Sequence, residues 1–285
     1  MTDWPKAPTC WIEARTLYVS VPFTWLLPAV KTMLAQRDFL WDKAIVGGPA
    51  VRLIPTYLEG LRDTTIDLGD CPGVLQRVNP EATKSTTGCV RKCKFCSVPD
   101  TEGALVELDD WPDLPVICDN NILAASNAHF DRVCDRLELQ DWSDFQGIDA
   151  RLLSTHHAAR LAGLPSCIVR LAYDSPTVRR QWDRAFGILL GAGFPKSRVR
   201  SYVLCGFGHS PESAWAICEY IKSCGARPLP QWYHPLDAMT YNAVLPCHRE
   251  HGWDEKERDR IMQYYYKHRG EKGPQKAVDA TRGME

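Results

Sequence analysis

The sequence predicts an α/β protein, in which short buried strands alternate with amphipathic helices along most of the chain. Apolar runs of strand length recur and are separated by segments whose apolar residues repeat at helical spacing. Serine and glycine residues stand where these helices would begin and end. Because a crossover helix between two strands returns the chain to the same edge of a sheet, this order favours parallel strands.

Six strands are predicted after residue 80. They cover residues 82–87, 115–118, 145–151, 167–173, 199–205 and 229–233. Ser126, Ser154 and Ser210 are expected to cap the helices that follow the second, third and fifth strands. The clearest helical stripe is formed by Val178, Trp182, Ala185, Phe186 and Leu189. This order indicates successive strand–helix units.

The two ends of the chain differ from this central part. Residues 1–80 predict a small Rossmann-like βαβ section, with strands at 17–21 and 44–49 and a helix that Thr24 caps. Residues 236–285 predict a charged helix at 254–269 and then a polar tail without fixed structure. The predicted domains are therefore 1–80, 81–235 and 236–285.

Composition excludes several classes of protein. Lysine plus arginine number 34 against 35 acidic residues, so no overall charge favours nucleic acid or a membrane. The twelve cysteines follow no regular framework, which is typical of the reducing cytoplasm. The chain begins without a signal-peptide pattern and has no apolar run long enough to span a bilayer. We expect a cytoplasmic protein with no membrane partner.

Three cysteines form the most specific motif. Cys89, Cys93 and Cys96 have the spacing C-x3-C-x2-C within one loop. Three thiolates from so short a loop can hold a cubic iron–sulfur cluster and leave the fourth iron open. Gly88 suits a sharp turn before the first cysteine, and Phe95 places an aromatic ring beside the cluster.

This loop resembles that of the radical S-adenosylmethionine (SAM) superfamily, whose spacing Cys89, Cys93 and Cys96 match and whose aromatic residue Phe95 matches. The resemblance implies a [4Fe–4S] cluster whose open iron binds SAM. It also implies cleavage of SAM to a 5′-deoxyadenosyl radical that abstracts hydrogen from a substrate. An electron donor such as flavodoxin or ferredoxin would reduce the cluster. The fold implied for residues 81–235 is a partial (βα)6 TIM-like barrel, with a helical extension at 236–285.

The flanks of the loop are most similar to the methylthiotransferase-like branch, although Glu102-Gly103 stands where that branch has Arg-Gly. A methylthiotransferase-like enzyme that modifies RNA is therefore one alternative. A non-enzymatic iron–sulfur protein for electron transfer or sensing is another, although such a protein normally has a fourth cysteine ligand. The flanks favour a nucleobase or nucleotide as substrate, and a peptide or a small metabolite stays open.

The turn Val46-Gly47-Gly48-Pro49 resembles the end of the cobalamin-binding domain of many radical SAM enzymes. That domain usually carries D-x-H-x-x-G, whereas no histidine precedes His129 here. We interpret residues 1–80 as a reduced remnant of that domain or a lid, without cobalamin.

Polar residues at the strand ends are candidates for SAM binding. The resemblance places Asp119, Asn120 and Asn121 where the family binds the amino group of SAM. Asp149 and Arg151 are expected to share one face, and Arg151 or Arg170 would face a carboxylate. Gly206 would let the backbone approach adenine. The alternatives are an Asx turn, an internal salt bridge and a plain turn.

Other metal sites are weaker interpretations. Zinc prefers four ligands, and the loop contains a single C-x2-C pair; a disulfide would require a secreted protein. A second cluster on Cys205, Cys218, Cys224 and Cys247 is weighed against packing of these cysteines in the core. Cys247 and His248 with His251 are a weak metal pattern.

Overall fold

The structure is a computed structural model that describes residues 7–36, 40–69 and 73–267. The predicted tail at 270–285 lies outside the described residues. The chain forms two compact units. The first comprises Met1–Ile148, Ala159–Cys167 and His234–Asn242, and the second comprises Asp149–Ala158, Ile168–Tyr233 and Ala243–Glu285. Neither unit coincides with one of the three predicted segments, so the domain division stays a prediction.

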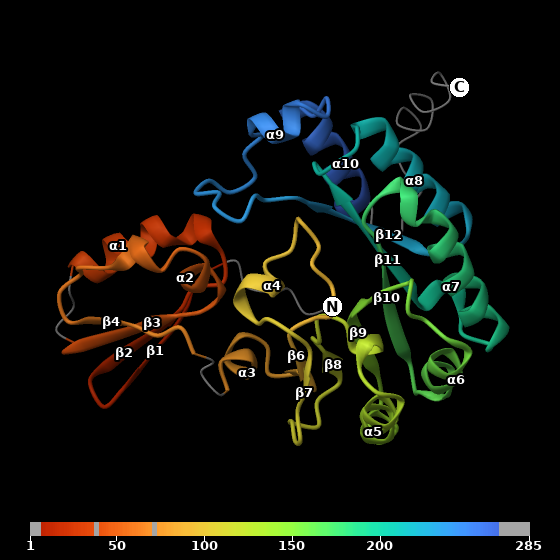
Figure 1. Cartoon of the computed structure of the whole chain (residues 1–285), viewed down its shortest axis with the longest axis horizontal. Helices are drawn as coiled ribbons and strands as arrows, with labels where there is room; N and C mark the ends of the chain where they lie inside the picture. Colours follow the sequence, from red (N-terminus) through yellow and green to blue (C-terminus); the bar gives the residue numbers. More distant parts are fainter. Residues whose placement is uncertain (1–6, 37–39, 70–72, 268–285) are drawn as a thin grey trace. The chain divides into compact units, whose positions relative to one another are not determined.

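The first unit begins with a four-stranded sheet in the order β1-β2-β3-β4 (Figure 1). Its strands are β1 (Thr9–Glu13), β2 (Thr16–Ser20), β3 (Lys43–Gly47) and β4 (Thr64–Ile66). β1 is antiparallel to β2, and β2, β3 and β4 are parallel. The sequence predicted β2 and β3 but missed β1 and β4, which bury little apolar surface.

Helices cover one face of this sheet (Figure 1): α1 (Leu27–Gln36), α2 (Pro49–Leu53) and the 3-10 turns η1 (Thr24–Leu26) and η2 (Pro55–Leu58). Leu17, Val19, Ala44 and Val46 point to the helical side and are buried. The prediction that Thr24 caps the helix is wrong, because Thr24 lies inside η1 and its hydroxyl donates to the carbonyl of Ala238 at 2.6 Å.

The rest of the first unit contains α3 (Val74–Val78), β5 (Ala82–Thr83), β6 (Thr86–Thr87), α4 (Val98–Thr101), β7 (Val106–Glu107), β8 (Val116–Ile117), η3 (Ile122–Ala124), α5 (Asn127–Leu137) and β9 (Ser143–Ile148). β5, β8 and β9 are parallel neighbours, and β6 pairs with β7 in a separate antiparallel ribbon. The single strand predicted at 82–87 is therefore wrong.

The second unit contains three parallel strands in the order β12-β11-β10, with helices between them. They are β10 (Cys167–Tyr173), β11 (Val199–Cys205) and β12 (Arg227–Trp232). The helix α6 (Thr155–Gly163) is divided between the two units at Ala158. The helices that follow are η4 (Pro176–Val178), α7 (Arg179–Gly191), η5 (Lys196–Arg198), α8 (Pro211–Ser223), α9 (Pro246–Arg249) and α10 (Glu255–Lys267). The bounds of β10 and β11 are those predicted.

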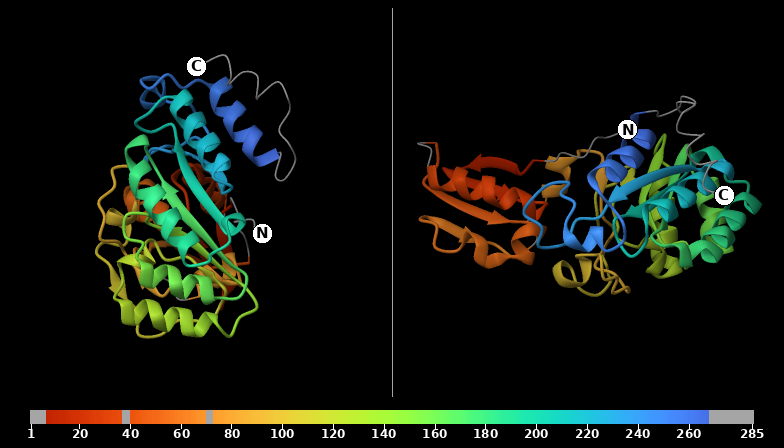
Figure 2. Two further views of the ribbon diagram at one scale, coloured as in Figure 1. Left: turned by 90° about the vertical axis from the view of Figure 1, so that its right-hand side faces the viewer. Right: turned by 90° about the horizontal axis from the view of Figure 1, so that it is seen from above.

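Helix α7 buries four residues of the predicted stripe, Trp182, Ala185, Phe186 and Leu189, whereas Val178 lies in η4 and is not buried. The indole N–H of Trp182 donates to Ser201 at 2.9 Å. α8 and α10 lie side by side (Figure 2), with Trp215 against the rings of Tyr264 and Tyr265. The predicted caps are present: Ser126, Ser154 and Ser210 accept hydrogen bonds from the backbone N–H three residues later.

The fold class is α/β, as predicted, because parallel strands alternate with helices in both units. Within the described residues, no helix combines the length and the apolar composition that a bilayer span requires.

Candidate functional site

The cysteine loop lies between β6 and α4. Cys89, Cys93 and Cys96 are half-buried thiols that form no disulfide. The backbone N–H of Cys96 donates to the carbonyl of Cys93 at 3.0 Å, and the N–H of Arg91 donates to the Cys89 sulfur at 3.4 Å. The loop is therefore an irregular turn whose first thiol already accepts a backbone hydrogen bond.

Gly88 is required at the start of this loop, as predicted for a sharp turn. Its φ is +68°, a left-handed conformation that side chains disfavour. A Cβ atom there would also overlap the backbone of Gly103 and Ala104. The next residue, Cys89, donates its N–H to the carbonyl of Gly103 at 3.1 Å. The backbone at Gly88 and the backbone at residues 103–104 therefore approach too closely for any residue other than glycine at position 88.

Glu102 holds the loop from the other side. One carboxylate oxygen accepts from the Lys84 ammonium at 2.7 Å. The other accepts from the backbone N–H of Gly88 at 3.0 Å and from the Asn120 amide at 2.7 Å. Burial raises the pKa of Glu102, but Lys84 and these hydrogen bonds outweigh it and lower the pKa below its usual value. Glu102 therefore carries a negative charge and joins three segments.

Asp119 follows β8 and is buried. One oxygen accepts from the backbone N–H groups of Ser85 and Thr86, both at 2.7 Å, and the other accepts from the Ser85 hydroxyl at 2.6 Å. Burial raises the pKa of Asp119, and the hydrogen bonds from Ser85 and Thr86 oppose this effect. These hydrogen bonds tie Asp119 to the segment between β5 and β6. They explain why the predicted strand is broken there, and they give Asp119 a positioning role.

Asn121 contacts the first cysteine of the motif. Its amide nitrogen is 3.9 Å from the Cys89 sulfur, a weak contact. Its carbonyl oxygen is buried and has no hydrogen-bond partner in the part of the chain that the structure describes. A buried amide oxygen without a donor is costly, so this atom is available for a ligand.

His129 was missed by the sequence analysis. Its Nε2 is 3.1 Å from the Ser85 hydroxyl, and its ring contacts Trp111. Burial lowers the pKa of His129, with Glu107 opposing and Arg132 adding to that effect. His129 supports the segment before the cysteine loop through Ser85. A single buried histidine on a helix gives no sequence signal for this contact.

The second unit holds the other predicted site residues. Arg151 donates to Asp149 through its side chain at 2.7 Å and through its backbone N–H at 3.0 Å. This ion pair is the alternative that the sequence analysis gave for these residues. The expected shared strand face is wrong, because β9 ends at Ile148 and Asp149 and Arg151 lie in the turn after it. Burial raises the pKa of Asp174, which follows β10, to about 6, with Arg151 opposing and Asp149 adding.

Arg170 lies in β10 and donates to the Tyr202 hydroxyl at 3.4 Å. Gly206 follows β11 with φ +89°, and a Cβ atom there would come within 3.0 Å of the side chains of His248 and Trp232. A side chain at position 206 would therefore be crowded by His248 and Trp232.

The remaining cysteines pack in the core where they are buried. Burial raises the pKa values of Cys205 and Cys218 far above that of an ordinary thiol. Both ring nitrogens of His248 lie at hydrogen-bond distance from backbone groups, of Leu245 and Tyr233. Within the described residues, no three His, Cys, Asp or Glu side chains are gathered around a point that would hold a single metal ion.

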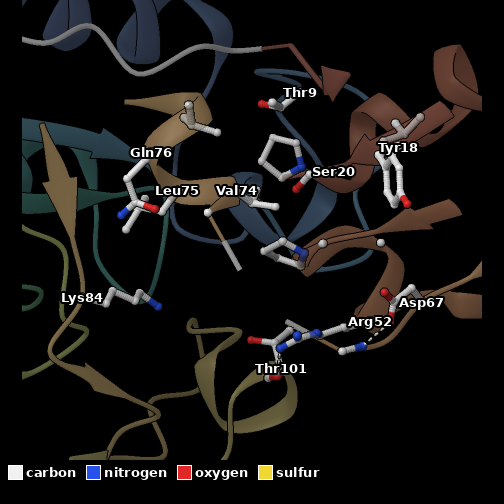
Figure 3. A pocket seen from close by; sticks show the side chains of 18 of the residues that line it. Thr9, Tyr18, Ser20, Arg52, Asp67, Val74, Leu75, Gln76, Lys84 and Thr101 are labelled. Atoms are coloured by element: carbon white, nitrogen blue, oxygen red, sulfur yellow. Dashed lines mark hydrogen bonds between the residues drawn. The ribbon is translucent and has the colours of Figure 1, made fainter. Parts of the chain in front are cut away.

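A cavity of about 710 Å³ lies within the first unit (Figure 3). Its lining includes Thr87, the residue before Gly88, so it lies beside the start of the cysteine loop. One wall is the sheet face opposite α1 and α2, with Tyr18 and Ser20. Another wall contains Lys84, Thr101 and Glu102. The described residues that line the cavity include no histidine and no cysteine. No local sequence pattern indicates this cavity, because its walls are far apart along the chain.

No protein-family model matches this sequence, and no curated protein matches it. The structure is similar to that of TsrM from Kitasatospora setae, a radical SAM methyltransferase solved with cobalamin and a [4Fe–4S] cluster bound. The TM-score is 0.57 at 12% identity, over 79% of this chain and 66% of TsrM. The match thus spans slightly less than two thirds of TsrM. Because the identity is only 12%, the match shows that the two chains share a fold and nothing further. At the level of fold, the chain is similar to a radical SAM enzyme.

Proposed function

We propose that this protein is a radical SAM enzyme. The observation that carries the proposal is the C-x3-C-x2-C loop, set at the end of the first strands of an α/β fold like that of TsrM. A [4Fe–4S] cluster on Cys89, Cys93 and Cys96 would supply the electron that cleaves SAM to a 5′-deoxyadenosyl radical, which abstracts hydrogen from a substrate.

The residues present fit such a cluster. Three thiols come from one loop, which leaves one iron for SAM. Gly88 lets the loop turn against residues 103 and 104, and Glu102 fixes its backbone from the opposite side. Cys205 and Cys218 sit in an apolar core, where a thiolate is disfavoured, so we propose one cluster and no second one.

The contacts favour Asn121 as the residue that meets the SAM amino group, because its buried oxygen lacks a donor and its amide lies next to Cys89. Asn120 and Asp119 would position it, since their polar groups are held by Glu102 and by residues 85–86. Phe95 would shield the cluster. We propose Arg170 or Arg151 for the SAM carboxylate, with Asp149 orienting Arg151, and Gly206 for the approach to adenine.

The first experiment is anaerobic reconstitution of the full chain with iron and sulfide. We expect about four irons per chain, a change of the EPR spectrum of the reduced cluster on addition of SAM, and formation of 5′-deoxyadenosine. Cys93→Ala should abolish all three. Cys224→Ala is the matched control, because Cys224 is also half-buried, and it should keep four irons. Wild-type 5′-deoxyadenosine formation by Cys93→Ala would refute the assignment.

The EPR measurement also separates the alternatives. An electron carrier or sensor would bind the cluster without a response to SAM. Transfer of a methylthio group to RNA would require a second sulfur source and an RNA substrate. Reduced flavodoxin or ferredoxin is the electron donor we propose, in a cytoplasmic setting.

We also propose that the protein works without cobalamin, unlike TsrM as solved. The cavity beside the cysteine loop offers cobalt no imidazole or thiol among its described lining residues. Hydroxocobalamin should therefore fail to copurify with protein produced in supplemented cells, as measured by the absorption of the extracted corrinoid. A stoichiometric amount would contradict this.

A further inference from the structure

The sheet face that lines the cavity carries a row of aromatic rings. Strand alternation turns Trp11, Tyr18 and Ile45 away from the helices α1 and α2 and into the cavity wall. Trp11 is opposite Tyr18 in the pairing of β1 with β2, and Tyr18 is opposite Ile45 in the pairing of β2 with β3. A helix would cover this face in a doubly wound fold; here a cavity of about 710 Å³ lies against it. That volume is in the range of small-molecule sites.

The rings form a stack that ends at Tyr18. Trp11 and Tyr18 are parallel, with 5.1 Å between ring centroids and 6° between planes. The Arg77 guanidinium covers Trp11 at 4.6 Å and is itself paired with Glu13 at 2.6 Å. Because β2 lies between β1 and β3, the Ile45 side chain borders Tyr18 on the side away from Trp11. A flat ring above Ile45 would stack on the part of the Tyr18 ring that extends beyond this shorter side chain.

The wall beyond Ile45 is bare backbone. A Cβ atom on Gly47 would lie 2.6 Å from the carbonyl oxygen of Asp67, and Gly48 has φ +99° with Val21 at 2.8 Å. Neither position accepts a side chain without strain. The carboxyl ends of parallel strands, where β3 ends at these glycines, are the usual edge for ligands in α/β sheets.

Asp67 provides a polar group at the same edge. It follows β4, the parallel neighbour of β3, and lines the cavity (Figure 3). One of its oxygens accepts from the N–H of Gly69 at 2.8 Å, which holds the carboxylate in place. An acidic residue about 20 positions after a glycine turn, at the end of the next parallel strand, is how βαβ units bind ribose hydroxyls. Gly47 and Asp67 have this spacing.

The charges of the cavity favour a neutral ligand. Lys84 is paired with Glu102 at 2.7 Å, and Arg52 donates to the carbonyl of Thr101 at 2.7 Å (Figure 3). The cations that line the walls therefore have partners within the protein. A nucleic acid strand would require a track of cations for its phosphates, and the short helix α2 offers no phosphate site.

We propose that this cavity binds a ribonucleoside, with the base stacked on Tyr18 and the ribose hydroxyls on Asp67. This deepens the proposed function, because it names the substrate class. Glu102 connects the cavity with the cysteine loop. It lines the cavity and accepts a hydrogen bond from the N–H of Gly88, the residue before Cys89.

The test is isothermal titration of the reconstituted full chain with adenosine, guanosine, cytidine, uridine and their 2′-deoxy forms, each without SAM. At least one ribonucleoside should bind, and its 2′-deoxy form should bind about tenfold more weakly. Tyr18→Leu should weaken binding roughly five- to a hundredfold, whereas Tyr18→Phe keeps the ring and the affinity. Asp67→Asn should remove the preference for ribose. Tyr241→Leu and Asp42→Asn are controls outside the cavity lining, and both should bind as wild type does.

Absence of saturable binding by every nucleoside up to millimolar concentration would overturn the proposal. So would wild-type affinity in both Tyr18→Leu and Asp67→Asn, or displacement of the nucleoside by SAM or hydroxocobalamin. Since the readout is binding, it is independent of SAM cleavage. Nucleoside binding that depends on Tyr18 and Asp67, without any 5′-deoxyadenosine formation, would preserve this inference and refute the radical SAM function.

Discussion

The carboxylate of Glu102 accepts a hydrogen bond from the backbone N–H of Gly88 at 3.0 Å, one residue before Cys89. The same oxygen accepts from Asn120, and the other oxygen pairs with Lys84. An acidic residue thus fixes the backbone at the start of the cysteine loop.

Removal of this carboxylate should destabilise the first unit. Glu102→Ala removes the acceptor of the Gly88 N–H and of Lys84 and one of the two acceptors of the Asn120 amide. It should lower the free energy of unfolding by about 1–3 kcal/mol. Urea denaturation measures this, with exposed Glu59→Ala as the control, expected within about 0.5 kcal/mol of wild type. Equal stability of the two variants would show that Glu102 does not hold the loop.

Gly88→Ala should damage the cysteine loop more than an ordinary left-handed glycine substitution. Gly60 is the matched control, because its φ is +78° and nothing lies within 4 Å of a Cβ atom there. Both variants incur about 1–2 kcal/mol of backbone strain. Gly88→Ala adds the overlap with Ala104, worth about 1–3 kcal/mol more. Iron content after reconstitution should fall for Gly88→Ala and not for Gly60→Ala; similar stability and iron content would contradict the assigned close approach.

Asn121→Ala should weaken SAM binding about ten- to a hundredfold, since it removes an acceptor for a charged amino group. The assay is SAM titration followed by the EPR spectrum of the reduced cluster. Asn127→Ala, at an exposed position on α5, is the control. If Asn121→Ala binds SAM like wild type, the amino-group assignment is wrong.

Arg170→Ala should weaken SAM binding as well, whereas Asp119→Ala should mainly lower stability by releasing Ser85 and Thr86.

His129 should make stability fall on acidification. Burial lowers its pKa in the folded state, so the unfolded chain binds the proton more readily. The contribution of His129 to stability is therefore complete above about pH 6.5 and is lost as pH falls through the lowered pKa. Urea unfolding from pH 7.5 to 5.0 should show a smaller loss for His129→Gln than for wild type. His251→Gln, an exposed histidine, should behave like wild type; an unchanged slope for His129→Gln would contradict the assignment.

Asp174 should make the protein less stable as pH rises, the opposite of the effect of His129. Its pKa is raised to about 6 by burial, so its unfavourable ionisation in the folded state grows as pH rises from about 4 to 6. Asp174→Asn should therefore stabilise the protein by up to about 3 kcal/mol at pH 8 and have no effect at pH 4. Thermal unfolding at the two pH values tests this, with exposed Asp237→Asn as the control. A destabilised Asp174→Asn at pH 8 would show that the charge is needed for folding.

Local patterns predicted the elements whose burial is regular. The bounds of β10 and β11 were predicted to the residue, because apolar side chains alternate there between a helix-covered face and the opposite one. The caps Ser126, Ser154 and Ser210 were predicted because an N-cap interaction spans only three residues. β1 and β4 were missed because pairing in the sheet stabilises them, and their own sequence buries little.

The sequence by itself determined the α/β class, the alternation of strands and helices after residue 115, and the cysteine loop, because each depends on neighbours in the chain. Tertiary structure decided what the polar residues contact. It bound Asp119 to residues 85–86, joined Glu102 to Gly88 and Lys84, and set Tyr18, Asp67 and Lys84 around one cavity. These contacts link residues tens of positions apart, and their energies depend on distance and burial, which no local pattern specifies.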